Sequence, residues 1–215
     1  MIDKDGRVTA YLANGRLRIA WLNRVDLTDL RPWAGDGMAD ERLCGAELLG
    51  IDMIQDDAIR MVARSQTNVH VFCATAQAPE ILTHEKTCDL RDRNSVAAAF
   101  VDAIPYLVGA STSWRVNPFS EEPPEEDPIE TFIDTCVCFD RVALRAGFLS
   151  AVAGYDNDEA CLCIVGADGR VQRRKALSKG LPNRVVIARN AAEAPRVAVV
   201  YGREITYLSF QGADS

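Results

Sequence analysis

The chain has 215 residues, of which 48% are hydrophobic and 26% are charged, and its formal net charge at pH 7 is −7. This composition is that of a globular protein and excludes extended disorder. The acidic balance argues against general nucleic-acid binding, because that depends on clustered Lys and Arg. No apolar run approaches the roughly 20 residues that cross a bilayer, and the charged N-terminal sequence MIDKDGRV is unlike a signal peptide. We therefore expect a cytoplasmic protein without a membrane partner.

The most regular feature of the sequence is a β-prone run, a short turn and a second β-prone run, which together predict a β-hairpin. Four of these hairpins follow a further strand candidate, whereas the first has no leading strand. In chain order, the hairpins are predicted at 7–22, 58–74, 105–119, 160–177 and 196–210, and the leading strands at 48–54, 96–101, 148–155 and 184–189.

The turns of these hairpins recur with uneven spacings whose mean is about 47 residues, and repeats of about 40 to 50 residues are typical of propeller blades with three or four strands each. The stretch FLSAVAGYDNDEACLCIVGADGRVQRRKAL at 148–177 shows the rhythm. The chain thus resembles a β-propeller. The repeat is WD40-like in spacing, although no unit carries the Gly-His or Trp-Asp dipeptides of WD40 repeats. The resemblance implies a single all-β domain over 1–215 with about four to five blade units. A β-sandwich or a pair of small barrels is the alternative, since short hairpins also build those folds.

Three segments interrupt the strand pattern. Residues 26–42 form a predicted loop with room for one helical turn, and the charged residues 86–94 are expected to lie in solvent. Residues 120–128 contain EEPPEEDP, where the prolines lack backbone donors and the like charges repel. We predict a mobile loop or internal linker at 120–128.

The two histidines of the chain both lie near cysteines, which gives the pattern H-x2-C-x10-H-x3-C. His70, Cys73, His84 and Cys88 are ligand types that zinc prefers. However, an odd separation places His70 and Cys73 on opposite faces of a regular strand, so chelation would require the strand to break. We therefore predict no metal and no cofactor, and keep these four residues only as weak zinc candidates.

Other chemistry-bearing residues have structural interpretations. An odd number of cysteines, seven, predicts free thiols rather than a disulfide framework. The pairs Cys136/Cys138 and Cys161/Cys163 are expected to fill a core layer. Asp156 and Asp158 resemble the start of a calcium loop, but Cys161 stands where such a loop needs glycine, so we interpret them as a turn.

The absence of a catalytic motif favours a non-enzymatic protein-interaction module, a subunit or adaptor scaffold in a larger complex whose partner is another protein chain. Trp33 and Trp114 are the aromatic candidates for that interface because tryptophan is enriched at binding hot spots. Arg173 and Lys175, from the single basic run, are the charged candidates. The alternative is a hydrolase-type enzyme with a loop-built or channel-mouth site, possibly metal-dependent, that uses Asp156 and Asp158 or the cysteine and histidine group.

Overall fold

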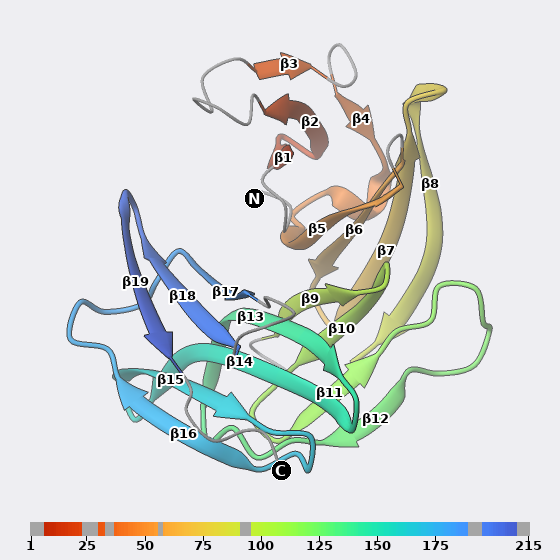
Figure 1. The fold of residues 1–215 in the computed structure, drawn as a ribbon. Helices are drawn as coiled ribbons and strands as arrows, with labels where there is room; N and C mark the ends of the chain where they lie inside the picture. The colour runs from red at the N-terminus through yellow and green to blue at the C-terminus, as the bar shows by residue number, and fades with distance from the viewer. Residues whose placement is uncertain are drawn as a thin grey trace. The chain divides into compact units, whose positions relative to one another are not determined.

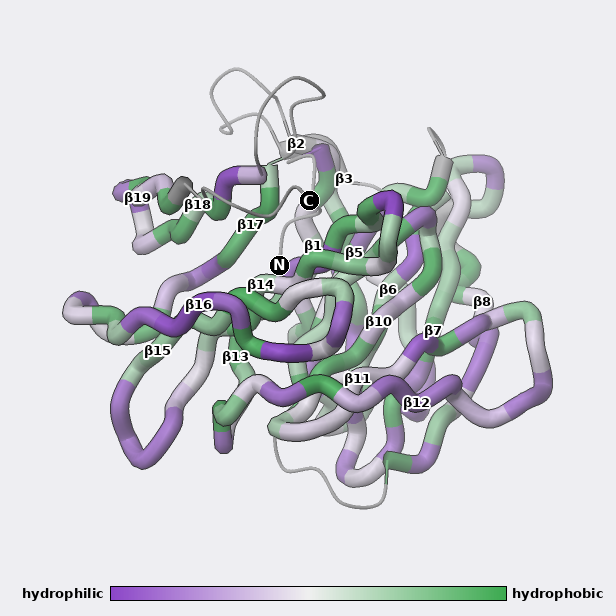
Figure 2. The backbone as a smooth tube through the Cα atoms, turned by 60° about the horizontal axis from the view of Figure 1, so that its bottom comes forward, coloured by the Kyte–Doolittle hydropathy of each residue, from purple (hydrophilic) through white to green (hydrophobic). Residues whose placement is uncertain are grey.

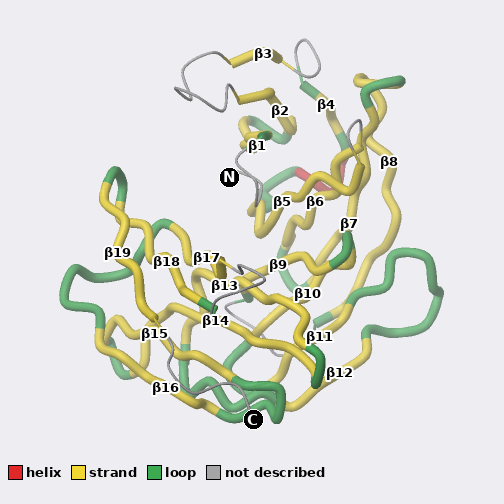
Figure 3. Tube along the Cα trace, viewed as in Figure 1, coloured by secondary structure: helices red, strands yellow, loops and turns green. Residues whose placement is uncertain are grey.

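The computed structural model describes residues 7–22, 30–32, 37–55, 58–90, 96–188 and 195–209. Strands dominate these residues, and the one helical element among them is a short 3-10 turn, η1 (Glu41–Leu43) (Figure 3). The strands form five small antiparallel sheets (Figure 1). The fold is therefore all-β with five blades of the propeller type, which confirms the fold class predicted from the hairpin repeat.

The sheets follow one another along the chain. The first contains β1 (Val8–Ala13), β2 (Arg16–Leu22), β3 (Leu30–Pro32) and β4 (Met38–Ala39). The second contains β5 (Glu47–Gln55), β6 (Ala58–Ser65), β7 (Asn68–Thr75) and β8 (Ala78–Asp89). The third contains β9 (Ala97–Val101), β10 (Ile104–Val108), β11 (Thr112–Arg115) and β12 (Glu125–Pro128). The fourth contains β13 (Thr135–Leu144), β14 (Gly147–Asp156), β15 (Glu159–Val165) and β16 (Val171–Ala176). The fifth contains β17 (Arg184–Ala188), β18 (Arg196–Tyr201) and β19 (Glu204–Ser209).

All five predicted hairpins are present, as β1–β2, β6–β7, β10–β11, β15–β16 and β18–β19. The β1–β2 turn shows why this hairpin could be predicted from the sequence. Asn14 and Gly15 both have positive φ, 52° and 71°, which is the backbone that a tight two-residue hairpin turn needs and that Asn-Gly adopts readily. The four predicted leading strands correspond to β5, β9, β14 and β17.

The chain divides into two compact units, each with its own core. The first unit is Met1–Arg93, Asp102–Pro105 and Val116–Pro124, and the second is Asn94–Val101, Tyr106–Arg115 and Glu125–Ser215. In the first unit, apolar side chains of the sheets β1–β4 and β5–β8 meet in one cluster, which includes Leu17, Met61 and Phe72. In the second, a cluster that includes Leu149 and Val197 joins the sheets β13–β16 and β17–β19. The single domain expected over 1–215 stays a prediction.

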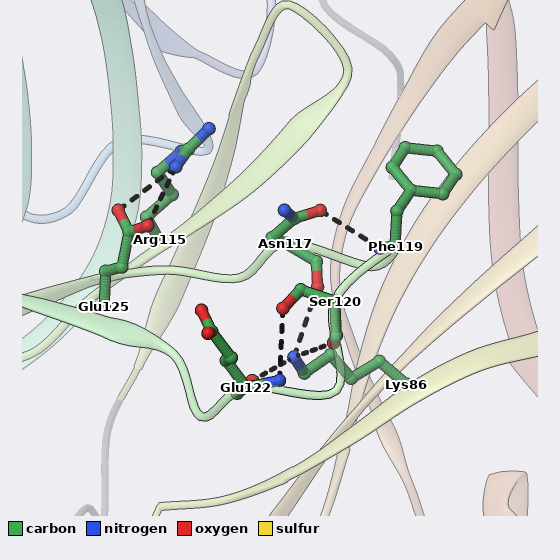
Figure 4. Close-up of polar contacts among 7 residues, drawn as sticks. All are labelled: Lys86, Arg115, Asn117, Phe119, Ser120, Glu122 and Glu125. Carbon is green, nitrogen blue, oxygen red and sulfur yellow. Dashed lines mark hydrogen bonds and ion pairs between the residues drawn. The ribbon is translucent and has the colours of Figure 1, made fainter.

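The segment 120–128 is partly β-strand, and its role as an internal linker stays a prediction. Its second half is the edge strand β12, which pairs with β11. Arg115 on β11 forms an ion pair with Glu125 on β12, at 3.1 Å (Figure 4). Pro128, the last residue of β12, is tolerated because an edge strand has one side without a neighbour.

No helix in the described ranges is both long and apolar enough to cross a membrane.

Candidate active site

A β-bulge in β8 brings His70, His84 and Thr87 together in the first unit. His84 pairs with Phe72 on β7 and Thr87 pairs with His70, so Glu85 is left as an extra residue without a partner in the ladder. Residues three apart on a regular strand point to opposite faces. The extra residue corrects this mismatch and places His84 and Thr87 on the same face as His70.

The Thr87 hydroxyl lies between the two imidazole rings. Thr87 Oγ1 is 3.0 Å from His70 Nδ1 and 2.9 Å from His84 Nε2, and the ring centroids of the histidines are 6.0 Å apart. His84 packs edge-on against Phe72, with 5.5 Å between centroids. His70 is buried, His84 is half-buried and Thr87 is exposed, so the hydroxyl is reachable from solvent.

Both histidines are held in their neutral form. Burial lowers the pKa of His70, and the positive charges of His84 and Arg42 lower it further, while Asp40 opposes them. Burial also lowers the pKa of His84, again assisted by Arg42 and opposed mainly by Asp40. Imidazoles with lowered pKa values are uncharged at neutral pH and can accept a proton.

The charged neighbours of the histidines, Asp40 and Arg42, lie at the turn η1. This turn follows β4 of the first sheet, and β4 contacts β8. Asp40 caps η1 by accepting a hydrogen bond from the Arg42 backbone N–H at 2.9 Å. Its carboxylate also forms an ion pair with the Arg42 guanidinium, at 3.0 Å. The N-cap therefore fixes the position of both charges relative to the turn.

The bulge also separates the four weak zinc candidates. The two histidines share one face of the sheet, whereas Cys73 and Cys88 belong to the opposite face, because Cys88 pairs with Val69 and not with a residue of the histidine face. Within the described residues, no three or more His, Cys, Asp or Glu side chains are grouped so that they could hold a metal. The four candidates therefore do not converge on one zinc ion, and no step below uses a metal.

Lys86, next to Thr87, fastens β8 from the other face of the sheet. Its ammonium donates to three backbone carbonyl oxygens, those of Asn117 at 3.2 Å, Ser120 at 2.6 Å and Glu122 at 2.5 Å (Figure 4). Asn117 in turn accepts a hydrogen bond from the Phe119 backbone N–H at 3.0 Å. These contacts hold the loop 117–122 against β8 and help to keep the strand in its bulged register.

The interface residues predicted from sequence have different outcomes. Trp33 lies outside the described residues. Trp114 is only 1% exposed and is a core residue, because its strand β11 turns the indole inward. The interface role predicted for Trp114 therefore does not agree with its burial. Arg173 and Lys175 are exposed on β16, which is hydrophilic along much of its length (Figure 2). Their role at an interface stays a prediction.

The acidic and cysteine candidates are structural. Asp156 forms an ion pair with Arg174, and Asp158 has a positive φ of 65° in the β14–β15 turn. Cys136, Cys138, Cys161 and Cys163 are all buried and free. Burial raises the pKa of Cys136 and Cys163 to about 12 and that of Cys138 to about 11, so these thiols are not nucleophiles at neutral pH.

Comparisons with known proteins identify the fold but no family. No protein-family profile matches the sequence, and no curated protein sequence matches it. Solved structures do match. A functionally unknown protein from Desulfotomaculum acetoxidans gives a TM-score of 0.50 at 10% identity, covering 98% of this chain and 68% of its own. A candidate gluconolactonase gives 0.51 at 13% identity, covering 98% and 74%. Regucalcin, a calcium-binding protein from Agrobacterium tumefaciens, gives 0.49 at 12% identity, covering 91% and 68%.

These matches correct the functional prediction. The expected non-enzymatic adaptor or scaffold is wrong, because the similar propellers include one that is named as an enzyme, the candidate gluconolactonase. The WD40-like character is likewise unsupported. Thr87 was missed because nothing in the sequence marks the bulge that brings it between the histidines.

Proposed function

We propose that the chain is a hydrolase whose reactive group is the Thr87 hydroxyl with His84 as its base. The observation that carries the proposal is the exposed hydroxyl held between two neutral imidazoles, at 3.0 and 2.9 Å. A nucleophile within hydrogen-bond reach of a base, with a further group that orients it, is the common arrangement for covalent hydrolysis.

Proton positions follow from the hydrogen bonds. A backbone hydrogen bond with Lys86 raises the pKa of His84, the direction expected when an imidazole N–H donates to a carbonyl oxygen. We assign that N–H to Nδ1, which leaves His84 Nε2 free to accept the Thr87 proton. Since the hydroxyl carries a single proton, His70 Nδ1–H then donates to Thr87 Oγ1 and orients it.

The reaction balances with these groups alone. Thr87 Oγ1 attacks the substrate carbonyl carbon while its proton passes to His84 Nε2. The bond to the leaving alkoxide then breaks, and the alkoxide takes the proton from His84. A water molecule gives its proton to His84, attacks the acyl-threonine ester and releases the acid, and Thr87 recovers its proton. Arg42 supplies positive charge near the site, where the developing oxyanion needs stabilisation.

The substrate class that this chemistry supports is a small ester or lactone. Such substrates have a carbonyl carbon open to attack and an alkoxide as the leaving group. The name of the candidate gluconolactonase agrees with that class. A cytoplasmic location remains part of the proposal and is supported by seven free cysteines, which suit a reducing compartment.

The test is hydrolysis of p-nitrophenyl acetate and of glucono-δ-lactone by wild-type protein and variants. We expect His84→Gln and Thr87→Val to lower kcat/KM by about 10²–10⁴-fold, the usual contribution of a positioned base. The conservative variant Thr87→Ser, which keeps the hydroxyl, serves as the control and should retain most activity. A burst of p-nitrophenol and a mass increase of one acetyl group on the Thr87 peptide are expected. Wild-type rates for Thr87→Val would refute the proposal.

A further inference from the structure

Arg141 on β13 is a buried cation in the second unit whose donors are only partly used. Its side chain is 5% exposed. Nε donates to Ser150 Oγ at 2.9 Å, and Nη2 donates to Ser113 Oγ at 3.2 Å. Nη1 is buried without a hydrogen-bond partner among the described residues. A buried donor left without a partner costs stability, so this nitrogen calls for an explanation.

The charge of Arg141 is also without an ion pair among the described residues. Three aromatic rings surround the guanidinium, with its Cζ 4.9 Å from the Tyr106 centroid, 5.5 Å from Phe139 and 5.1 Å from Phe148. Burial lowers the pKa of Arg141, and only Tyr106 and Asp127 oppose that effect. Cation–π contacts recover part of the lost hydration, but they do not neutralise the charge.

Ser150 provides a second unused donor beside the first. Its Oγ accepts a hydrogen bond from Arg141 Nε, and within the described residues its own hydroxyl proton has no acceptor. Ser113, in contrast, donates weakly to the Asp127 carbonyl oxygen at 3.4 Å. The group therefore offers one full positive charge, a free guanidinium nitrogen and a free hydroxyl proton, all enclosed by aromatic rings.

We propose that Arg141 and Ser150 bind a small carboxylate. A monoanion neutralises the positive charge of the Arg141 guanidinium, whereas a phosphate dianion brings more negative charge than that guanidinium can balance. Carboxylate oxygens also match the planar donors of a guanidinium. Of the three rings, Phe148 is half-buried while Tyr106 and Phe139 are buried, so the β13–β14 hairpin is the most exposed side of this site. This site is independent of the histidine site, which lies in the other unit.

The experiment is a titration of the full chain with sodium acetate against sodium chloride at matched ionic strength. Two signals are followed, the melting temperature and the Arg141 side-chain resonances in protein labelled with ¹⁵N-arginine. We expect a saturable rise in melting temperature with acetate, and a shift of the Arg141 resonances with the same half-saturation. No difference between acetate and chloride would overturn the proposal and leave a bound water as the partner of Nη1.

Variants decide whether these two side chains form the site. Ser150→Ala removes one donor, and we expect it to weaken acetate binding about tenfold or more. Arg141→Lys keeps the charge but loses the planar donors and should weaken binding by a similar factor. Arg145→Lys, in the exposed turn of the same hairpin, is the matched control and should bind as wild type. Unchanged affinity in Ser150→Ala and Arg141→Lys, or tighter binding of inorganic phosphate than of acetate, would refute the assignment.

Discussion

Breaking the buried ion pair between Arg60 and Glu85 by removing one partner should be strongly destabilising. Arg60 Nε lies 2.6 Å from one Glu85 oxygen and Nη2 lies 3.0 Å from the other, with exposed fractions of 2% and 14% for the two side chains. Arg60 Nη1 also donates to the Ala103 carbonyl oxygen at 2.5 Å, and its Cζ lies 4.9 Å from the Phe119 centroid. Removing one partner of such a pair leaves an unpaired buried charge, which costs about 3–5 kcal/mol.

We therefore expect Arg60→Met to lower the free energy of unfolding by about 3 kcal/mol, near the low end because water reaches Glu85. The double variant Arg60→Met/Glu85→Gln should recover much of this loss, because it removes the unpaired charge as well. Urea unfolding at pH 7, followed by circular dichroism, measures both.

A matched control exists on the same strand. Arg64 pairs with Glu47 at 2.7 Å, but the two side chains are 22% and 62% exposed. Exposed pairs contribute at most about 1 kcal/mol, so Arg64→Met should have a small effect. Equal losses in Arg60→Met and Arg64→Met, or strictly additive effects in the double variant, would refute the argument from burial.

Three further predictions concern other parts of the chain. Gly154→Ala should lower the free energy of unfolding by about 3 kcal/mol, the upper end for overpacking, because the new Cβ would lie 2.0 Å from a backbone carbonyl oxygen of β13. Gly180→Ala is the control: its Cβ meets only open space, but its φ of 78° should still cost about 1 kcal/mol. Equal melting temperatures of the two variants would contradict this prediction. In native protein at pH 8, a thiol reagent should modify the exposed Cys44 first and the half-buried Cys73 next, and the five buried cysteines only after unfolding; fast reaction of all seven thiols would be inconsistent with the fold. Because folding lowers the pKa of both histidines below the ordinary value of about 6.5, the unfolded chain binds more protons below neutral pH. Their contribution to the free energy of unfolding is thus complete above pH 7 and is lost as the pH falls below about 6.5. The urea midpoint of the wild type should therefore be lower at pH 5.5 than at pH 7.5, and this difference should be smaller in a variant with both histidines changed to glutamine.

The sequence predicted the hairpins well because their signal is local. Asn14-Gly15 fixes a turn, and the runs on either side alternate as strands do. The strands β8, β12 and β13 were not predicted, because the residues of these segments are also compatible with other structures. By sequence alone Lys86 belongs to a charged segment expected in solvent, and only the structure shows the three carbonyl oxygens that bind its ammonium. Such long-range contacts have no local signature.

One extra residue explains why His84 and Cys88 lie on opposite faces and how the proposed catalytic group comes together. Without a bulge, His84 and Cys88 would share a face, as residues four apart on a strand do. Glu85 shifts the alternation, so that the face of His84 receives Thr87 and the opposite face receives Cys88. The buried pair with Arg60 gives Glu85 a reason to occupy the extra position, since its carboxylate is bound on the face away from the histidines. The ion pair and the geometry of the proposed catalytic group are therefore linked through Glu85. Arg60→Met should lower the hydrolytic activity of Thr87 although Arg60 does not contact Thr87.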